Sequence, residues 1–282
     1  MERKKLCVIG DPVEHSLSPV IHNTVLRTLA LPYTYGRVQV RAGETADFLA
    51  RAGQEGYAGF NATMPHKTAL VALADELDAD AKLFQAVNTV VLRDGKVYGS
   101  NTDGRGFVQS LVERGISPEG KTITVLGAGG AARAVVLKLA QSGAKRIYVC
   151  NRTLAKAEML SREFPQQITA CDFSARTLAD CALFSDLLIN ATPMGMTQVG
   201  SRFADFSFLD ALAKNAPVCD LIYSPPETEF LRYAREHGHE TVNGLGMLIY
   251  QALFALEAFT GTEIDAPEVI PDVRAALQAA LK

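Results

Sequence analysis

The chain has 282 residues, about twice the length of a typical domain, so we expect two domains. Hydrophobic residues make up 48% of the chain and charged residues 21%, a balance that excludes a disordered or fibrous protein. The net charge is −3 and no run of basic residues occurs. We therefore expect neither a nucleic-acid partner nor a membrane partner.

Signals for secretion, disulfide formation and metal binding are weak. The basic N-terminus is followed by an apolar run too short for a signal peptide, and the apolar stretch 244–259 is shorter than the ~20 residues of a membrane span. The five cysteines are scattered without CxxC spacing, and no two histidines show HxxxH spacing. We expect a cytoplasmic protein with reduced, mostly packed thiols, no disulfide framework and no metal site.

Short β-branched runs alternate with amphipathic stretches along the first hundred residues. We expect strands at 6–9, 33–40 and 59–62, and helices at 19–30, 44–54 and from Pro65 onward. Two further runs, 87–92 and 96–98, flank Asp94-Gly95, which is a hairpin turn signal. This pattern predicts an open, mostly parallel α/β sheet with an antiparallel addition.

The alternation restarts after the loop at 116–120, with a strand at 122–126. We place a domain boundary near Gly104, and a helix at about 105–115 forms the connection. The tail from Gly244 onward has the pattern of a helix, and it is so apolar that it needs a packing partner. We therefore expect the C-terminal helices to return to the first domain.

A glycine-rich turn follows the strand at 122–126. The sequence reads strand, GxGxxA, helix, in which Gly127 permits a tight turn and Gly129 lets the backbone approach a pyrophosphate. The following helix N-terminus offers unpaired N–H groups to phosphate. We predict a dinucleotide site at Gly127, Ala128, Gly129, Gly130 and Ala131, with a plain tight turn as the alternative.

The next strand, 147–150, should end beside the adenosine ribose. An NAD site carries Asp or Glu at this position, whereas this chain has Asn151, Arg152 and Thr153, with Lys156 one turn later. Cationic and hydroxyl groups suit a 2′-phosphate, so we predict NADP over NAD. The alternative is a solvated arginine at a helix start.

The fold class is therefore α/β with two domains. We expect a substrate-binding domain at 1–104 plus 240–282 and a Rossmann dinucleotide-binding domain at 105–239.

Polar residues of the first domain suggest a reactive site. Lys67 is expected in the first turn of the helix opening at Pro65, where a cation opposes the helix dipole and loss of its proton is favoured. Asp103 could face Lys67 and favour its protonated form, which opposes the effect of the helix dipole. Alternatively, Asp103 is a simple turn or cap residue. Such a pair can orient a hydroxyl and transfer its proton. Asn88, at a strand start, is equally ambiguous.

Two serines precede the first helix. Ser18 before Pro19 has the pattern of an N-cap with proline at the first helical position. A cap role leaves Ser16 unexplained. Two hydroxyls at a helix N-terminus can hold a small carboxylate without an arginine.

Taken together, these motifs resemble the shikimate dehydrogenase family over nearly the whole chain. The matching segments, in order, are Gly10–Asn23, Asn61–Lys67, Ala86–Thr89, Asn101–Gly104, Gly127–Ala131, Asn151–Thr153, Asn190–Pro193, Asp220–Tyr223 and Gly244–Gln251. Gln85 replaces a usual glycine and Ala62 a common valine, which removes no functional group.

The resemblance implies a role for each matching position. Lys67 and Asp103 would be the catalytic pair. The substrate, shikimate or 3-dehydroshikimate, would be bound by Ser16, Ser18, Asn61, Thr63, Asn88, Tyr223 and Gln251. Leu221, Gly244 and Met247 would lie near the nicotinamide.

The resemblance implies reversible NADPH-dependent reduction of 3-dehydroshikimate to shikimate, a step of aromatic amino-acid (chorismate) biosynthesis. One alternative is a quinate/shikimate dehydrogenase that uses NAD. Another is a non-catalytic sensor of shikimate or NADP, which retention of both Lys67 and Asp103 disfavours. The sequence leaves the oligomeric state open, with a homodimer among the states it allows.

Overall fold

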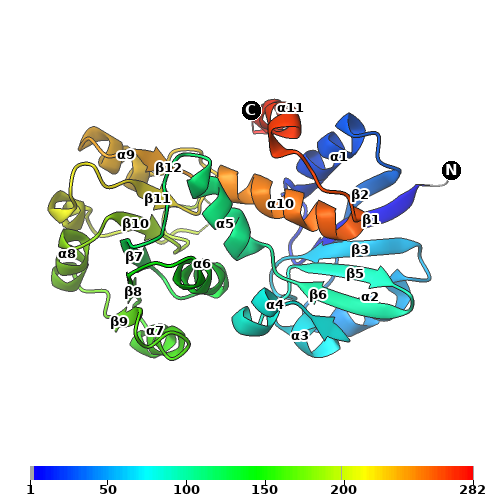
Figure 1. Ribbon diagram of the computed structural model, residues 1–282, viewed down its shortest axis with the longest axis horizontal. Helices are drawn as coiled ribbons and strands as arrows, with labels where there is room; N and C mark the ends of the chain where they lie inside the picture. Colours follow the sequence, from blue (N-terminus) through cyan, green and yellow to red (C-terminus); the bar gives the residue numbers. More distant parts are fainter. Residues whose placement is uncertain (1–2, 198, 282) are drawn as a thin grey trace. The chain divides into compact units, whose positions relative to one another are not determined.

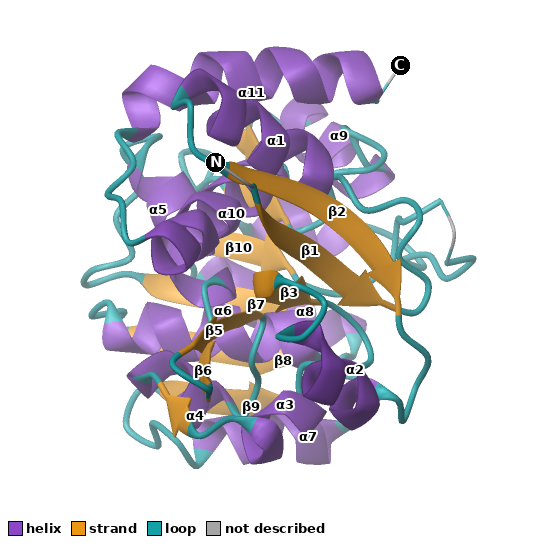
Figure 2. Ribbon diagram, turned by 90° about the vertical axis from the view of Figure 1, so that its right-hand side faces the viewer, coloured by secondary structure: helices purple, strands orange, loops and turns teal. Residues whose placement is uncertain are grey.

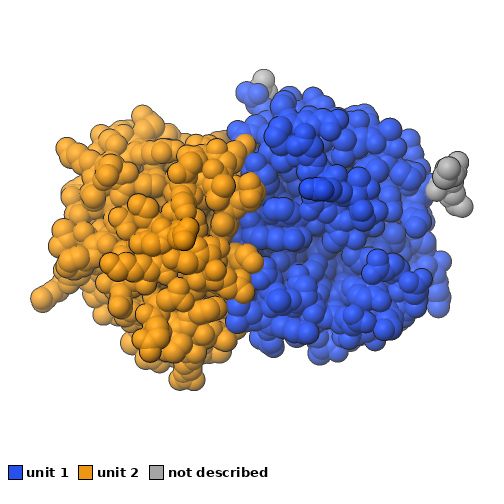
Figure 3. Space-filling model, viewed as in Figure 1, with its two compact units in different colours: residues 1–106, 248–282 blue, residues 107–247 orange. Residues whose placement is uncertain are grey.

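The computed structural model describes residues 3–197 and 199–281. The chain divides into two compact units (Figure 3): unit 1 contains residues 1–106 and 248–282, and unit 2 contains residues 107–247. Among the described residues, no helix combines the length and the apolar character needed to cross a membrane.

Unit 1 is built on a six-stranded mixed sheet. Its strands are β1 (Lys4–Gly10), β2 (Tyr33–Gln39), β3 (Tyr57–Ala62), β4 (Glu76–Leu77), β5 (Thr89–Arg93) and β6 (Lys96–Ser100), in the order β2-β1-β3-β5-β6-β4. β1 runs parallel to β2 and β3, and β5 runs antiparallel to β3 and β6. The carboxyl ends of β1, β3 and β6 and the start of β5 therefore share one edge of the sheet.

The predicted hairpin is confirmed, because Asp94 and Gly95 join β5 to β6 with φ of 53° and 74°. Two positive φ values are typical of a tight turn whose twist matches the flanking strands. The short strand β4 was not predicted.

The helices of unit 1 are α1 (Ser18–Thr28), α2 (Thr45–Ala52), α3 (Ala69–Leu73), α4 (Ala79–Phe84) and α11 (Ala266–Ala280), with the later part of α10 (Leu245–Thr260). Figures 1 and 2 show α11 beside α1, and the Thr28 hydroxyl donates to Asp272 at 3.0 Å. The predicted return of the C-terminal helices to the first domain is confirmed.

The helix predicted to open at Pro65 begins four residues later, at Ala69. The Lys67 carbonyl accepts a hydrogen bond from the Val87 N–H at 2.8 Å. That carbonyl is therefore already occupied by a residue outside the helix. Residues 64–68 form turns instead.

Unit 2 is a six-stranded parallel sheet. Its strands are β7 (Thr122–Leu126), β8 (Arg146–Cys150), β9 (Ile168–Cys171), β10 (Leu187–Asn190), β11 (Val218–Asp220) and β12 (Thr241–Val242), in the order β12-β11-β10-β7-β8-β9. The chain order reverses between β7 and β10, which is the switch point at which Rossmann folds bind dinucleotides. The predicted Rossmann topology is confirmed.

The helices of unit 2 are α6 (Gly130–Gln141), α7 (Leu154–Ser161), α8 (Ala175–Leu183), α9 (Glu229–Glu236) and a 3-10 helix at Ser207–Ala211, with most of α5 (Asp103–Val112) and the start of α10. Helix α6 follows β7 and α7 follows β8. Each helix therefore begins at the carboxyl edge of the sheet, where parallel α/β folds hold ligands.

Candidate active site

Lys67 and Asp103 form an ion pair although 36 positions separate them. Lys67 Nζ lies 2.5 Å from Asp103 Oδ2. Lys67 follows β3 and Asp103 follows β6, so both lie at the shared edge of the unit 1 sheet. The Asp103 side chain is 10% exposed and that of Lys67 is 28% exposed. The ammonium is therefore held by a nearly buried carboxylate while it still reaches solvent.

Lys67 lies outside the first turn of a helix, in contrast to the sequence-based prediction. It belongs to the turns before α3, a helix of five residues. The helix-dipole argument therefore does not apply to it. Its neighbour His66 is structural: the ring bonds the Thr45 hydroxyl at 2.7 Å and the Val40 carbonyl at 2.8 Å.

Asn88 fixes the orientation of Asp103. Its Nδ2 donates to Asp103 Oδ1 at 2.8 Å and to the Thr102 hydroxyl at 2.9 Å. Its Oδ1 accepts from the Thr102 N–H at 2.9 Å and from the Thr89 hydroxyl at 2.8 Å. An amide has two donor hydrogens and two acceptor lone pairs. All four are used within the protein.

The hydrogen-bond network continues from Asn88 into unit 1. Asn61 Nδ2 donates to the Thr89 hydroxyl at 2.9 Å, and Asn61 Oδ1 accepts from the Tyr35 hydroxyl at 2.7 Å. Burial raises the pKa of Tyr35 well above its ordinary value, so this hydroxyl keeps its proton. Tyr35 stacks on His22 with ring centroids 3.9 Å apart, and burial lowers the pKa of His22 to about 3. The network that leads from Tyr35 to Asp103 therefore consists of neutral groups.

Tyr35, Thr89 and Thr102 were not predicted as site residues. Tyr35 looks like an ordinary strand residue in the sequence. Thr89 and Thr102 belong to the segments 86–89 and 101–104, which the sequence singled out. Nothing in the sequence indicated that these two threonines bond to Asn88.

Ser16 and Ser18 lie half-buried at the start of α1. The predicted N-cap at Ser18 is wrong: Leu17 occupies that position and makes no side-chain cap bond. Ser16 Oγ instead accepts from the Ser18 N–H at 3.3 Å, and the Arg37 guanidinium donates to the Ser16 carbonyl at 2.6 Å. Among the described residues, the Ser18 hydroxyl has no partner, so it is available to a ligand.

Thr63 and Gln251 also belong to unit 1. Thr63 follows β3 beside Gly10, where a Cβ would lie 2.5 Å from Thr63 Cγ2. Gln251 is nearly buried in α10, and its backbone carbonyl accepts from the Thr102 hydroxyl at 2.9 Å. Gly106 permits this close approach, since a Cβ there would lie 2.6 Å from the Gln251 nitrogen. The side-chain carbonyl of Gln251 has no partner in the described part of the chain.

The glycine-rich turn of unit 2 has the geometry of a phosphate cradle. Gly127 adopts φ of 105°, and its N–H donates to the Cys150 carbonyl at 2.8 Å. Gly129 caps α6, and both Gly129 and Gly130 are exposed with open space where a Cβ would stand. Ala128 is half-buried and Ala131 is exposed. The backbone can therefore approach a pyrophosphate at the N-terminus of α6.

The residues expected at the ribose follow β8, the strand beside β7. Asn151 Nδ2 donates to the Thr153 carbonyl at 2.8 Å and so holds the loop closed. Arg152, Thr153 and Lys156 are exposed. Within the described residues, the Arg152 guanidinium has no acceptor. These cationic groups can receive an anion, and no carboxylate interrupts the segment 151–153.

The residues expected near the nicotinamide lie at the carboxyl ends of β11 and β12. The Gly244 N–H donates to the Ile222 carbonyl at 3.0 Å, and a Cβ at Gly244 would collide with the Leu221 carbonyl. Met247 is half-buried in the first turn of α10. Tyr223 belongs to this same unit, and partial burial raises its pKa.

Asp220 organises this edge of unit 2. It accepts from Asn190 Nδ2 at 3.0 Å, from the Ile222 N–H at 3.0 Å and from the Thr228 hydroxyl at 2.7 Å. Burial nevertheless outweighs these three donors and raises its pKa from 3.8 to about 7. The carboxyl therefore ties the loop that carries Leu221 and Tyr223 to the neighbouring strand.

The raised pKa of Asp220 predicts a pH-dependent stability. Between its ordinary pKa of 3.8 and about 7, the folded protein holds a proton that the unfolded chain has released, so stability falls as the pH rises. The loss is about 4 kcal/mol and is complete above about pH 7. Asp220→Asn should remove this slope in urea unfolding, while Asp94→Asn, at the exposed hairpin, should keep it. An unchanged slope in Asp220→Asn would contradict the raised pKa.

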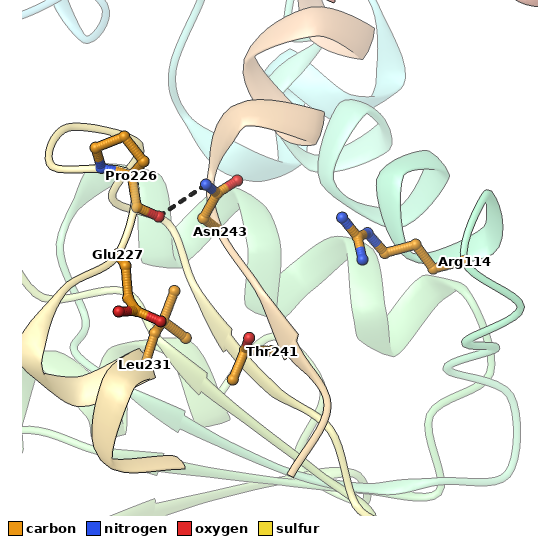
Figure 4. Close-up of a pocket in the computed structure, with 6 residues that line it drawn as sticks. All are labelled: Arg114, Pro226, Glu227, Leu231, Thr241 and Asn243. Atoms are coloured by element: carbon orange, nitrogen blue, oxygen red, sulfur yellow. Dashed lines mark hydrogen bonds between the residues drawn. The ribbon is translucent and has the colours of Figure 1, made fainter. Parts of the chain in front are cut away.

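Two surface hollows of unit 2 contain none of the residues predicted for the site. The smaller, of about 130 Å³, is lined by Arg114, Pro226, Glu227, Leu231, Thr241 and Asn243 (Figure 4). Asn243 Nδ2 donates to the Pro226 carbonyl there at 2.9 Å. The larger, of about 540 Å³, lies beside the end of α9. Neither hollow marks the predicted substrate or dinucleotide site.

The fold and the two groups of residues define a dinucleotide-dependent oxidoreductase of the two-unit α/β class. Family models match three stretches: "Shikimate dehydrogenase substrate binding domain" at 8–90, "Shikimate / quinate 5-dehydrogenase" at 110–200 and "Shikimate 5′-dehydrogenase C-terminal domain" at 244–278. The chain belongs to the shikimate dehydrogenase family.

Individual relatives agree with this assignment. The chain is 40% identical over 262 residues to a shikimate dehydrogenase (NADP⁺) of Alkaliphilus metalliredigens, with 91% of each chain covered. A crystal structure of a shikimate dehydrogenase in complex with NADP⁺ is 37% identical, with a TM-score of 0.88 and coverage of 99% and 96%. A Thermus thermophilus enzyme in complex with NADP(H) and shikimate is 32% identical, with a TM-score of 0.85 and coverage of 97% and 99%.

Proposed function

We propose that this protein catalyses the reversible NADPH-dependent reduction of 3-dehydroshikimate to shikimate, a step of aromatic amino-acid (chorismate) biosynthesis. The observation that carries the proposal is the ion pair of Lys67 and Asp103, held at 2.5 Å at the sheet edge that also carries the polar residues of unit 1. The names and bound ligands of the relatives support the same reaction and the same cofactor.

Unit 2 fits NADP through two features of its own residues. The open backbone at Gly129 and Gly130 accommodates the pyrophosphate, and Arg152 with Lys156 offers positive charge to the 2′-phosphate. Bound NADPH supplies the hydride for the carbonyl carbon. We assign unit 2 as the cofactor-binding domain and unit 1 as the substrate-binding domain.

Lys67 and Asp103 are assigned as the acid–base pair. An ammonium has three N–H bonds, and Asp103 accepts one of them. The remaining N–H bonds can donate to the substrate oxygen and transfer a proton to it as the carbonyl is reduced. In the reverse direction the same nitrogen takes the hydroxyl proton. Asp103 keeps the amine in place for both directions.

The other polar residues are assigned to binding the substrate or to positioning the catalytic pair. Ser16 and Ser18 are proposed to hold the substrate carboxylate, and Thr63, Tyr223 and Gln251 its ring oxygens. Both amide hydrogens of Asn61 are used, by the Asn88 carbonyl and the Thr89 hydroxyl, so Asn61 is proposed only to accept from a ring hydroxyl. Asn88 has no free amide hydrogen, so we assign it to the orientation of Asp103.

The reaction is tested by following absorbance of the reduced cofactor with purified protein. Shikimate with NADP⁺ should give the highest kcat/KM, above quinate with either cofactor and above shikimate with NAD⁺. Higher kcat/KM with quinate or with NAD⁺ would favour a quinate/shikimate dehydrogenase. Tight binding of shikimate and NADP⁺ without turnover would favour a sensor and refute the catalytic role.

Arg152→Ala should raise KM for NADP⁺ by about 10- to 100-fold, because a charge-assisted hydrogen bond is worth about 1.5–3 kcal/mol. KM for NAD⁺, which lacks the 2′-phosphate, should change little. Arg146→Ala is the matched control, since Arg146 begins the same strand at the opposite edge of the sheet. Equal losses with both cofactors would contradict the assignment of Arg152 to the 2′-phosphate.

A further inference from the structure

Three of the five cysteines form a cluster in unit 2, although they are scattered in the sequence. The Sγ atoms of Cys150, Cys171 and Cys181 all lie within 4.8 Å of one another, and those of Cys171 and Cys181 are 3.8 Å apart. All three are free thiols. Cys150 and Cys171 end the neighbouring parallel strands β8 and β9 in register, and Cys181 comes from α8.

The spacing of one pair of these sulfurs matches that of a metal thiolate centre, and the third sulfur lies within 4.8 Å of both. Zinc–sulfur bonds are about 2.3 Å long, so two sulfurs on a tetrahedral ion lie about 3.8 Å apart. The pair Cys171 and Cys181 already has this spacing. We propose that this cluster is a binding site for a single thiophilic d¹⁰ cation, of which Zn²⁺ and Cd²⁺ are representative.

The surroundings favour a soft ion over a hard one. Cys150 and Cys181 belong to an apolar core cluster, and among the described residues no carboxylate or imidazole joins the three sulfurs. Magnesium and calcium require oxygen ligands, whereas thiolates select zinc and other soft cations. Cys171 is half-buried, so the cluster is partly accessible to solvent, and a water molecule is proposed as the fourth ligand.

The cluster lies directly behind the backbone of the predicted cofactor site. The Cys150 carbonyl accepts from the Gly127 N–H at 2.8 Å, and the Cys171 carbonyl accepts from the Asn151 N–H at 3.1 Å. A bound ion would join the ends of β8 and β9 to α8. It would thereby hold in place the loops that follow β7 and β8, which carry Gly127 and Asn151. It would therefore raise thermal stability, with release of one proton to solvent from each thiol that binds. This inference does not depend on the proposed reaction.

The test is a titration of the full-length reduced protein with Cd²⁺ in the absence of air. We expect sulfur-to-cadmium charge-transfer absorbance that saturates at one ion per chain, is displaced by Zn²⁺, and is accompanied by a higher Tm. Absorbance that does not saturate, or that saturates at a ratio other than one ion per chain, would overturn the proposal with the parent protein alone. The proposal would also be overturned if two of these thiols formed a disulfide in air while the reduced protein bound no cation.

Variants locate the site. Cys171→Ala and Cys181→Ala should each weaken Cd²⁺ binding by about 100-fold or more, beyond the cost of losing an outer-shell partner. Cys219→Ala, which removes a buried thiol of β11 in the same unit, should bind Cd²⁺ as the parent does. Cys171 is half-buried, so its removal should preserve the fold, which circular dichroism checks. Full binding by folded Cys171→Ala would refute the site.

Discussion

Lys67→Ala is expected to lower kcat by about 10²- to 10⁴-fold while KM for shikimate changes little. Alanine removes the only group of the proposed pair that can give a proton to the substrate oxygen, whereas the residues proposed to bind the substrate remain. Steady-state kinetics with shikimate and NADP⁺ measures both constants. The variant also leaves the Asp103 carboxylate nearly buried without its cation, so thermal unfolding should show some loss of stability.

The matched control is Lys96→Ala. Lys96 also belongs to unit 1 and pairs with a carboxylate, Glu76, at 3.0 Å, but both side chains are more than half exposed. Exposed ion pairs contribute little to stability. This variant should therefore keep kcat and Tm near those of the parent. A near-normal kcat in Lys67→Ala would remove Lys67 from the reaction.

Asp103→Asn is expected to lower kcat by a similar factor of about 10²–10⁴ with a smaller effect on KM. Asp103 accepts at both oxygens, from Lys67 at Oδ2 and from Asn88 at Oδ1. An asparagine amide can accept at only one of these positions, so its NH₂ group must face one of the two donors. Lys67 or Asn88 then moves, and the geometry of proton transfer is lost.

Two comparisons separate this mechanism from simple unfolding. The double variant of Lys67→Ala and Asp103→Asn should be little slower than either single variant, because groups that act as a unit are not additive. Asp94→Asn makes the same chemical change at the exposed hairpin turn and should leave kcat unchanged. Additive losses in the double variant would show that the two residues act independently.

The sequence predicted the features that depend on a few neighbouring residues. Asp94-Gly95 forms a tight turn because both residues accept positive φ, and Gly127 begins the turn before α6 with φ of 105°. The prediction failed at Lys67, where helix-forming residues follow Pro65 but the loop before β5 bonds to the Lys67 backbone. The Val87 N–H that occupies the Lys67 carbonyl lies 20 positions further along the chain.

By itself, the sequence determined the class of fold, the glycine-rich turn, the basic character of the loop after β8 and the identity of the residues available for chemistry, because strand ends and turns leave local signals. Only the tertiary structure decided which side chains meet. The antiparallel insertion of β5 between β3 and β6 places Asn88 beside Asp103, and parallel pairing of β8 with β9 brings Cys150 to Cys171. Strand order and register depend on the packing of the entire sheet, and no short segment of sequence contains that information.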